Sequence, residues 1–180
     1  MDVWSQYFRE IPCAITLVPA KDYASKEGMI EINLIALKSG ALRRKQVIET
    51  GIPSSACYGP CVRAGELVFP SGMMAVGQDG LVPRADYALD FDALSLSGQV
   101  QGDLLLSYAE SICKAVNVPM QNVVRAQYFV TDIRDFSGIA GVWSARYGKR
   151  PQPFSGVQVP APLPPTGAAV IAADFWIYAA

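Results

Sequence analysis

The sequence predicts an α+β domain in which a β-sheet carries helices on one face. Three segments support this prediction. Residues 65–76, GELVFPSGMMAV, are rich in strand-forming residues, and residues 101–116 place apolar side chains at helical spacing. Residues 123–132, VVRAQYFVTD, alternate as a half-buried strand does, with Val124 expected on the same face as Tyr128. Apolar side chains therefore recur with the helical period of about 3.6 residues and with the strand period of 2 within one stretch of chain.

The other elements follow in order along the chain. Gly72 allows a bend within the first strand-forming segment, GQDG is typical of a turn, and residues 83–99 are expected to be a loop that carries an insertion. Pro119 ends the first helix. Residues 135–148 predict a second helix that ends near Gly148. The final two strands are predicted within residues 153–165 and 167–179, which gives the order β-β-α-β-α-β-β.

Composition excludes several classes of function. Histidine is absent, so histidine-based acid–base catalysis and Ser-His-Asp or Cys-His nucleophile activation are excluded. The formal net charge is −1 and the basic residues are scattered, so we expect no nucleic-acid partner. The four cysteines lack zinc-site spacing, so we expect no metal and no other cofactor. The opening MDVWSQ lacks the pattern of a secretory leader, and no apolar run is long enough to span a bilayer, so we expect a cytoplasmic protein with reduced thiols and no membrane partner.

The first 40 residues repeat the end of the chain. VWSQYF (residues 3–8) matches VWSARYG (residues 142–148) as a helix end, ITLVPA matches GVQVPA as a strand, and GMIEINLIAL matches GAAVIAADFWIYA as a closing strand. The three matches occur in the same order at similar spacing, which indicates internal repetition. We therefore expect residues 1–40 to be a partial repeat, residues 41–56 a linker and residues 57–180 a complete domain.

The complete part resembles the Rid or YjgF proteins, the reactive intermediate deaminases also known as endoribonuclease L-PSP. The resemblance rests on YGPCVRAGELVFPSG, on NVVRAQYFVTDIRDF and on the closing strands. It implies a chorismate-mutase-like α+β fold with a mixed sheet and two helices on one face. It also implies a trimer with clefts between subunits, no cofactor, and hydrolysis of 2-imino or enamino acids to 2-keto acids and ammonia.

This sequence differs from the family pattern at positions that the resemblance assigns to this chemistry. Phe154 lies where the family has the arginine that would hold the substrate carboxylate, Cys61 replaces a tyrosine, and Asp174 replaces a glutamate. Ser71 and Gly72 of the SG element are retained, and Arg150 could substitute for the arginine. These six residues are the candidate cleft residues, and none is assigned a catalytic role. Four of them have a plainer alternative: Phe154 and Cys61 as packing, Ser71 as support for a bulge and Arg150 as a solvated loop residue. Asp174, a carboxylate in an otherwise apolar strand, is expected to line a site or an interface.

The sequence therefore predicts a Rid-like protein with an altered cleft that acts on, or binds, a small metabolite less anionic than a 2-imino acid. The alternative is a non-catalytic assembly subunit that completes a multi-chain Rid-like oligomer, and an active imine or enamine deaminase is the least favoured. The partial repeat is expected to be completed by another polypeptide, or else to pack on its own domain or on a second copy. Ribonuclease activity is disfavoured by the charge balance and the missing histidines.

Overall fold

The computed structural model describes residues 2–10, 12–21, 27–38, 40, 45–53, 59–77, 80–81, 93–150, 152–161, 163 and 169–180. The helices are α1 (Asp2–Phe8), α2 (Ala93–Ala115), α3 (Phe136–Tyr147) and the short 3-10 helices η3 (Met120–Asn122) and η4 (Ile133–Asp135). The strands are β1 (Lys45–Ile48), β2 (Cys61–Ala64), β3 (Leu67–Phe69), β4 (Met73–Met74), β5 (Val76–Gly77), β6 (Gly80–Leu81), β7 (Val123–Val130), β8 (Ser155–Gln158) and β9 (Ile171–Tyr178).

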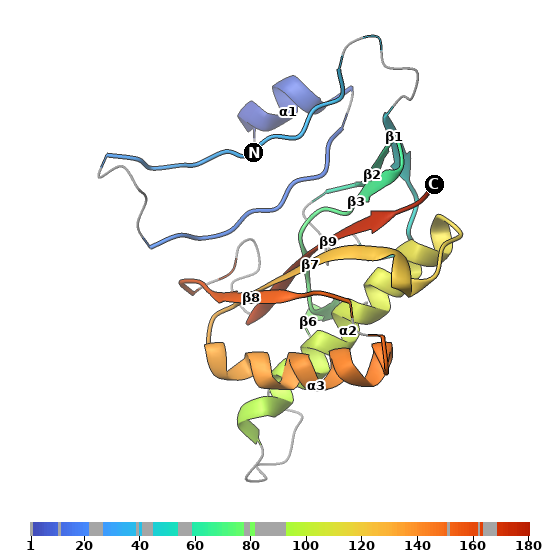
Figure 1. Cartoon of the computed structure of the whole chain (residues 1–180). Coiled ribbons are helices and arrows are strands. Elements are labelled where there is room, and N and C mark those ends of the chain that lie inside the picture. The colour runs from blue at the N-terminus through green and yellow to red at the C-terminus, as the bar shows by residue number, and fades with distance from the viewer. Residues whose placement is uncertain are drawn as a thin grey trace.

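Seven strands form one mixed sheet. Its order is β1-β2-β3-β9-β7-β8, and β4 pairs separately with β9. The pairing of β7 with β8 is parallel, whereas the other pairings in this sheet are antiparallel. Helices α2 and α3 lie side by side against one face (Figure 1). The predicted α+β class, with two helices on one face of a mixed sheet, is confirmed.

The core lies between this sheet and the two helices. On β9, Ile171, Ala173, Phe175 and Ile177 are buried and alternate with Asp174 and Trp176, which belong to the opposite face. Tyr128 on β7 stands edge-on to the rings of Trp143 and Phe175, at centroid distances of 6.2 and 5.8 Å. Such edge-to-face contacts stabilise a core beyond the burial of area alone.

The start of the domain differs from the prediction. Residues 45–48, which were expected in a linker, form β1 and pair with all four residues of β2. The segment KQVI is too short for its alternation to be recognised, and its strand conformation depends on the partner strand. Helix α2 likewise begins at Ala93, inside the expected loop of residues 83–99, of which residues 83–92 lie outside the described part.

A β-bulge changes the face of one predicted residue. The register between β7 and β9 shifts between Val123 and Arg125. Val124 is therefore 47% exposed, and Val123 takes its place in the core. The expectation that Val124 faces the core with Tyr128 was wrong for this reason.

The N-terminal part lies beside the domain. After α1, residues 12–20 and 28–38 are extended, and neither stretch forms part of a strand ladder with other described residues. Figure 1 shows them running in opposite directions above the sheet. The first stretch is joined to the domain by two hydrogen bonds, from Ile15 N to Ser71 Oγ at 3.0 Å and from Gly72 N to Ile15 O at 2.9 Å.

Candidate functional site

A cavity of about 470 Å³ lies between β1, the start of β2 and helix α2. Its walls come from β1 and the residues that follow it, from the loop before β2, from the segment between β3 and β4, and from one side chain of α2. The lining residues are Val47, Ile48, Glu49, Thr50, Gly51, Ile52, Gly59, Pro60, Cys61, Pro70, Ser71, Met73 and Ile112. A volume of this size is in the range of small-molecule sites.

The lining mixes apolar side chains with polar groups. Its polar side chains include Thr50 and Ser71, and among the described lining residues Glu49 is the one that carries a charge, and it is exposed. Thr50 Oγ1 accepts a hydrogen bond from Ile52 N at 3.3 Å, which shapes the turn in which Gly51 has a φ of +68°. A ligand here would meet both apolar and polar groups, with one carboxylate among the described residues.

Ser71 is buried at the edge of the cavity, but its hydroxyl serves the fold. It donates to Pro60 O at 2.9 Å and accepts from Ile15 N at 3.0 Å. Gly72 adjoins it and donates to Ile15 O. The SG element therefore joins the loop before β2 to the N-terminal stretch, and the Ser71 hydroxyl has its donor and one acceptor position already in use.

Cys61 is buried, lines the cavity and pairs across the sheet edge with Ile48. Two other thiols are held in the protonated form. Burial raises the pKa of Cys13, although the nearby charge of Lys45 lowers it, and burial raises the pKa of Cys113 to about 11. A protonated thiol is a poor nucleophile, so neither Cys13 nor Cys113 has the character of a reactive cysteine.

Asp174 lies in a polar cluster on the sheet face away from the helices. Its carboxylate, 14% exposed, forms an ion pair with Arg125 on β7, with Oδ2 and Nη1 2.6 Å apart. The same guanidinium donates to Gln127 Oε1 and lies over the ring of Trp176, 4.8 Å from its centroid. Arg125 and Gln127 were not among the predicted site residues, although the alternation of β7 already put both on one face of the strand.

Phe154 packs inside the domain. Its ring lies 4.8 Å from that of Trp143, 5.3 Å from that of Phe136 and 6.3 Å from that of Tyr128. Arg150 is exposed in the turn after α3. Neither residue lines the cavity. The structure thus puts Cys61 and Ser71 in the cavity lining, with Gly72 next to Ser71 in the chain, and puts Asp174, Phe154 and Arg150 at other places.

The described part of the chain contains neither a cluster of metal-ligating side chains nor a candidate membrane-spanning helix. No three histidine, cysteine, aspartate or glutamate side chains gather there as a metal site would require. None of the helices described has the length and apolar character needed to cross a membrane.

Comparisons with known proteins identify the fold. Profiles of protein families match no part of the sequence, and no curated protein matches it. Solved structures do match. RidA from the Antarctic bacterium Psychrobacter sp. is 22% identical, with a TM-score of 0.55, over 74% of this chain and 98% of its own. Yeast Mmf1 is 16% identical, with a TM-score of 0.58, over 76% of this chain and 100% of its own.

A YjgF/YER057c/UK114 family protein from Mycobacterium tuberculosis is 21% identical, with a TM-score of 0.54, over 75% of this chain and 99% of its own. These neighbours are covered almost whole, and the match leaves about a quarter of this chain outside their fold. The domain that carries the cavity has the Rid/YjgF fold.

Proposed function

We propose that the chain binds a small, largely apolar and uncharged or positively charged metabolite in the cavity beside β1, and that it does not hydrolyse 2-imino acids. The observation that carries this proposal is the charge of the cavity lining, in which Glu49 is the one charged side chain among the described residues. A 2-imino acid is bound through its carboxylate, for which a site needs a fixed cation. The exposed carboxylate of Glu49 favours a positively charged ligand over an anion.

The position of the family arginine supports the same conclusion. The sequence resemblance assigns Phe154 to that position, and its ring packs against those of Trp143 and Phe136. Arg125, another arginine of the sheet, already donates to Asp174 and Gln127. Loss of one bidentate contact to a charged group costs roughly 1.5–3 kcal/mol, or about one to two decades in affinity.

A second function, an assembly subunit, is favoured by a separate observation. The extended stretch of residues 28–38 carries large apolar side chains that are exposed.

The binding proposal is tested with three probes that share one skeleton: phenylethylamine, phenylacetamide and phenylacetate. In thermal-shift and calorimetry measurements, phenylethylamine or phenylacetamide should bind most tightly and phenylacetate most weakly. Glu49→Gln should weaken the amine by up to about fivefold, the worth of a solvent-exposed ion pair, and leave the amide unchanged. Glu10→Gln, an exposed carboxylate that does not line the cavity, is the matched control. Tightest binding by phenylacetate, or no binding by any probe, would contradict the proposal.

A further inference from the structure

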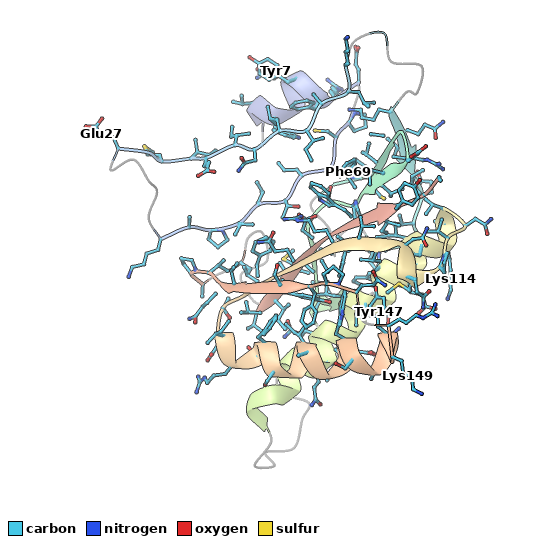
Figure 2. The ribbon with its side chains drawn as sticks, viewed as in Figure 1. Tyr7, Glu27, Phe69, Lys114, Tyr147 and Lys149 are labelled. Carbon is cyan, nitrogen blue, oxygen red and sulfur yellow. The ribbon has the colours of Figure 1, made fainter. Side chains whose placement is uncertain are left out.

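Residues 12–16, which we call the strap, are seated on the domain. All five are half-buried, whereas Tyr7 of α1 is 77% exposed and Glu27 is also exposed. Figure 2 shows the side chains of Tyr7 and Glu27 at the margin of the molecule, away from the sheet. The strap is the longest half-buried run in the described part of residues 2–38.

Both backbone groups of Ile15 bond the SG element. Its N–H donates to Ser71 Oγ at 3.0 Å, and its carbonyl accepts from Gly72 N at 2.9 Å. The strap also lies over Gly59, because a Cβ there would be 3.8 Å from Ile15 Cγ2 and 3.9 Å from Cys13 O. One residue of extended chain therefore bonds two neighbouring residues of the domain, and the first of them lines the cavity.

A path of contacts leads from the strap to the far wall of the cavity. Ser71 Oγ, which accepts from Ile15, donates to Pro60 O at 2.9 Å. Pro60 directly precedes Cys61, the first residue of β2, and Cys61 pairs with Ile48 of β1. All four domain residues on this path line the cavity. Because a hydroxyl that accepts one hydrogen bond donates the next more strongly, loss of the Ile15 bond weakens the bond to Pro60 as well.

The strap also lies near the start of β1. Burial raises the pKa of the Cys13 thiol, and the charge of Lys45, the first residue of β1, lowers it in part. A charge has this effect on a group that is close to it in space. The strap therefore borders β1, the loop before β2 and the segment between β3 and β4, which are three of the segments that wall the cavity.

The strap can leave the domain without unfolding it. Two hydrogen bonds hold it, and residues 12–16 belong to no strand ladder with other described residues. Local openings of segments held in this way cost far less free energy than global unfolding. A docked and a released form of the strap are therefore both compatible with the folded domain.

We propose that docking of the strap on Ser71 and Gly72 sets the shape of the cavity and thereby its affinity for a ligand. With the strap docked, the wall around Pro60 is held in the form that binds. With the strap released, Ser71 loses one of its two partners and this wall loosens. Ligand and strap therefore stabilise each other, since such coupling acts in both directions. The effect on affinity rests on the proposed function, whereas the effect on the cavity wall does not.

Ile15→Pro tests the proposal, because proline has no N–H to donate to Ser71 Oγ and Ile15 does not line the cavity. Ile15→Val keeps both backbone bonds and controls for the change of side chain. Leu17→Pro controls for a proline in the same stretch, since the Leu17 N–H makes no hydrogen bond to a described residue. Circular dichroism should show all three variants folded as the wild type is.

Hydrogen exchange of the ligand-free chain, followed by mass spectrometry, tests the effect on the wall. In Ile15→Pro, peptides that cover residues 47–52 and 61–64 should exchange roughly two- to tenfold faster than in the wild type, as expected for the loss of one hydrogen bond. Both controls should exchange as the wild type does. The proposal is overturned if the faster exchange is confined to residues 12–16 and 71–72, or if it extends equally to β7, as general destabilisation would.

Calorimetry with phenylethylamine or phenylacetamide, whichever binds the wild type more tightly, tests the effect on affinity. Its Kd should rise roughly two- to tenfold in Ile15→Pro and stay unchanged in both controls. In the wild type, a saturating amount of it should slow the exchange of residues 12–16.

The two measurements separate this proposal from the proposed function. Equal affinity for the wild type and Ile15→Pro overturns the coupling and leaves the proposed function standing. If neither probe binds the wild type while the wall peptides exchange faster in Ile15→Pro, the proposed function and the effect on affinity are refuted, and the effect of the strap on the cavity wall is supported.

Discussion

Several residues that the resemblance predicted for a ligand cleft support the fold of this chain. Phe154 packs its ring against Trp143 and Phe136, and the Ser71 hydroxyl bonds both the loop before β2 and the N-terminal stretch. The sequence could name these positions, because they follow recognisable motifs. It could not tell packing from binding, because that depends on which side of the sheet each side chain occupies.

At the scale of single residues, the Asp174 carboxyl makes the free energy of unfolding depend on pH. Burial raises the pKa of the Asp174 carboxyl, and the hydrogen bond and charge of Arg125 lower it only in part. The folded state then binds this proton more tightly than the unfolded state, so the contribution of Asp174 to stability falls as pH rises from the ordinary aspartate range toward neutrality. The free energy of unfolding of the wild-type chain should therefore fall relative to Asp174→Asn over that range.

Urea unfolding at a series of pH values measures this difference. In an Arg125→Gln background, in which the partner that lowers the pKa of Asp174 is gone, the same comparison should show a steeper fall. If the free energy of unfolding of the wild-type chain instead rises relative to that of Asp174→Asn as the pH rises, the assignment is contradicted.

At the scale of elements, the long periodic segments were predictable and the short ones were not. Helix α3 and strands β7, β8 and β9 lie where their patterns put them. Strand β1 has four residues and depends on β2 for its conformation, and the bulge in β7 follows from its pairing with β9. The start of α2 was missed because serines and a glycine there are more typical of loops.

The glycine in that first part of α2 has a packing reason. A Cβ on Gly98 would lie 1.9 Å from the backbone oxygen of Asp135 in η4, so the helix approaches η4 too closely for any side chain. Gly98→Ala should lower the free energy of unfolding by about 3 kcal/mol. Gly141→Ala in α3, where a Cβ meets nothing within 4 Å, should raise it by about 0.5–1 kcal/mol. Chemical denaturation measures both, and equal effects would refute the close approach.

At the scale of the whole molecule, the domain fold could be predicted from ordered motifs, whereas its assembly could not. The expected trimer stays a prediction, because a single chain carries no direct sign of symmetry. Of the residues that line the cavity, the sequence named Cys61 and Ser71 as candidates but not Glu49, whose place depends on β1. Arg125 was missed because its pairing with Asp174 joins residues far apart in the sequence.

The claim that this fold is present without the deaminase chemistry is tested most directly by ammonia release. The purified chain is mixed with 2-imino acids generated freshly in the assay, beside buffer and beside a Rid protein that has the family arginine. Ammonia release by this chain should equal that of buffer, since the Phe154 ring packs against the core and no described residue of the cavity lining carries a positive charge. Release clearly above buffer, in proportion to the amount of chain added, would contradict it.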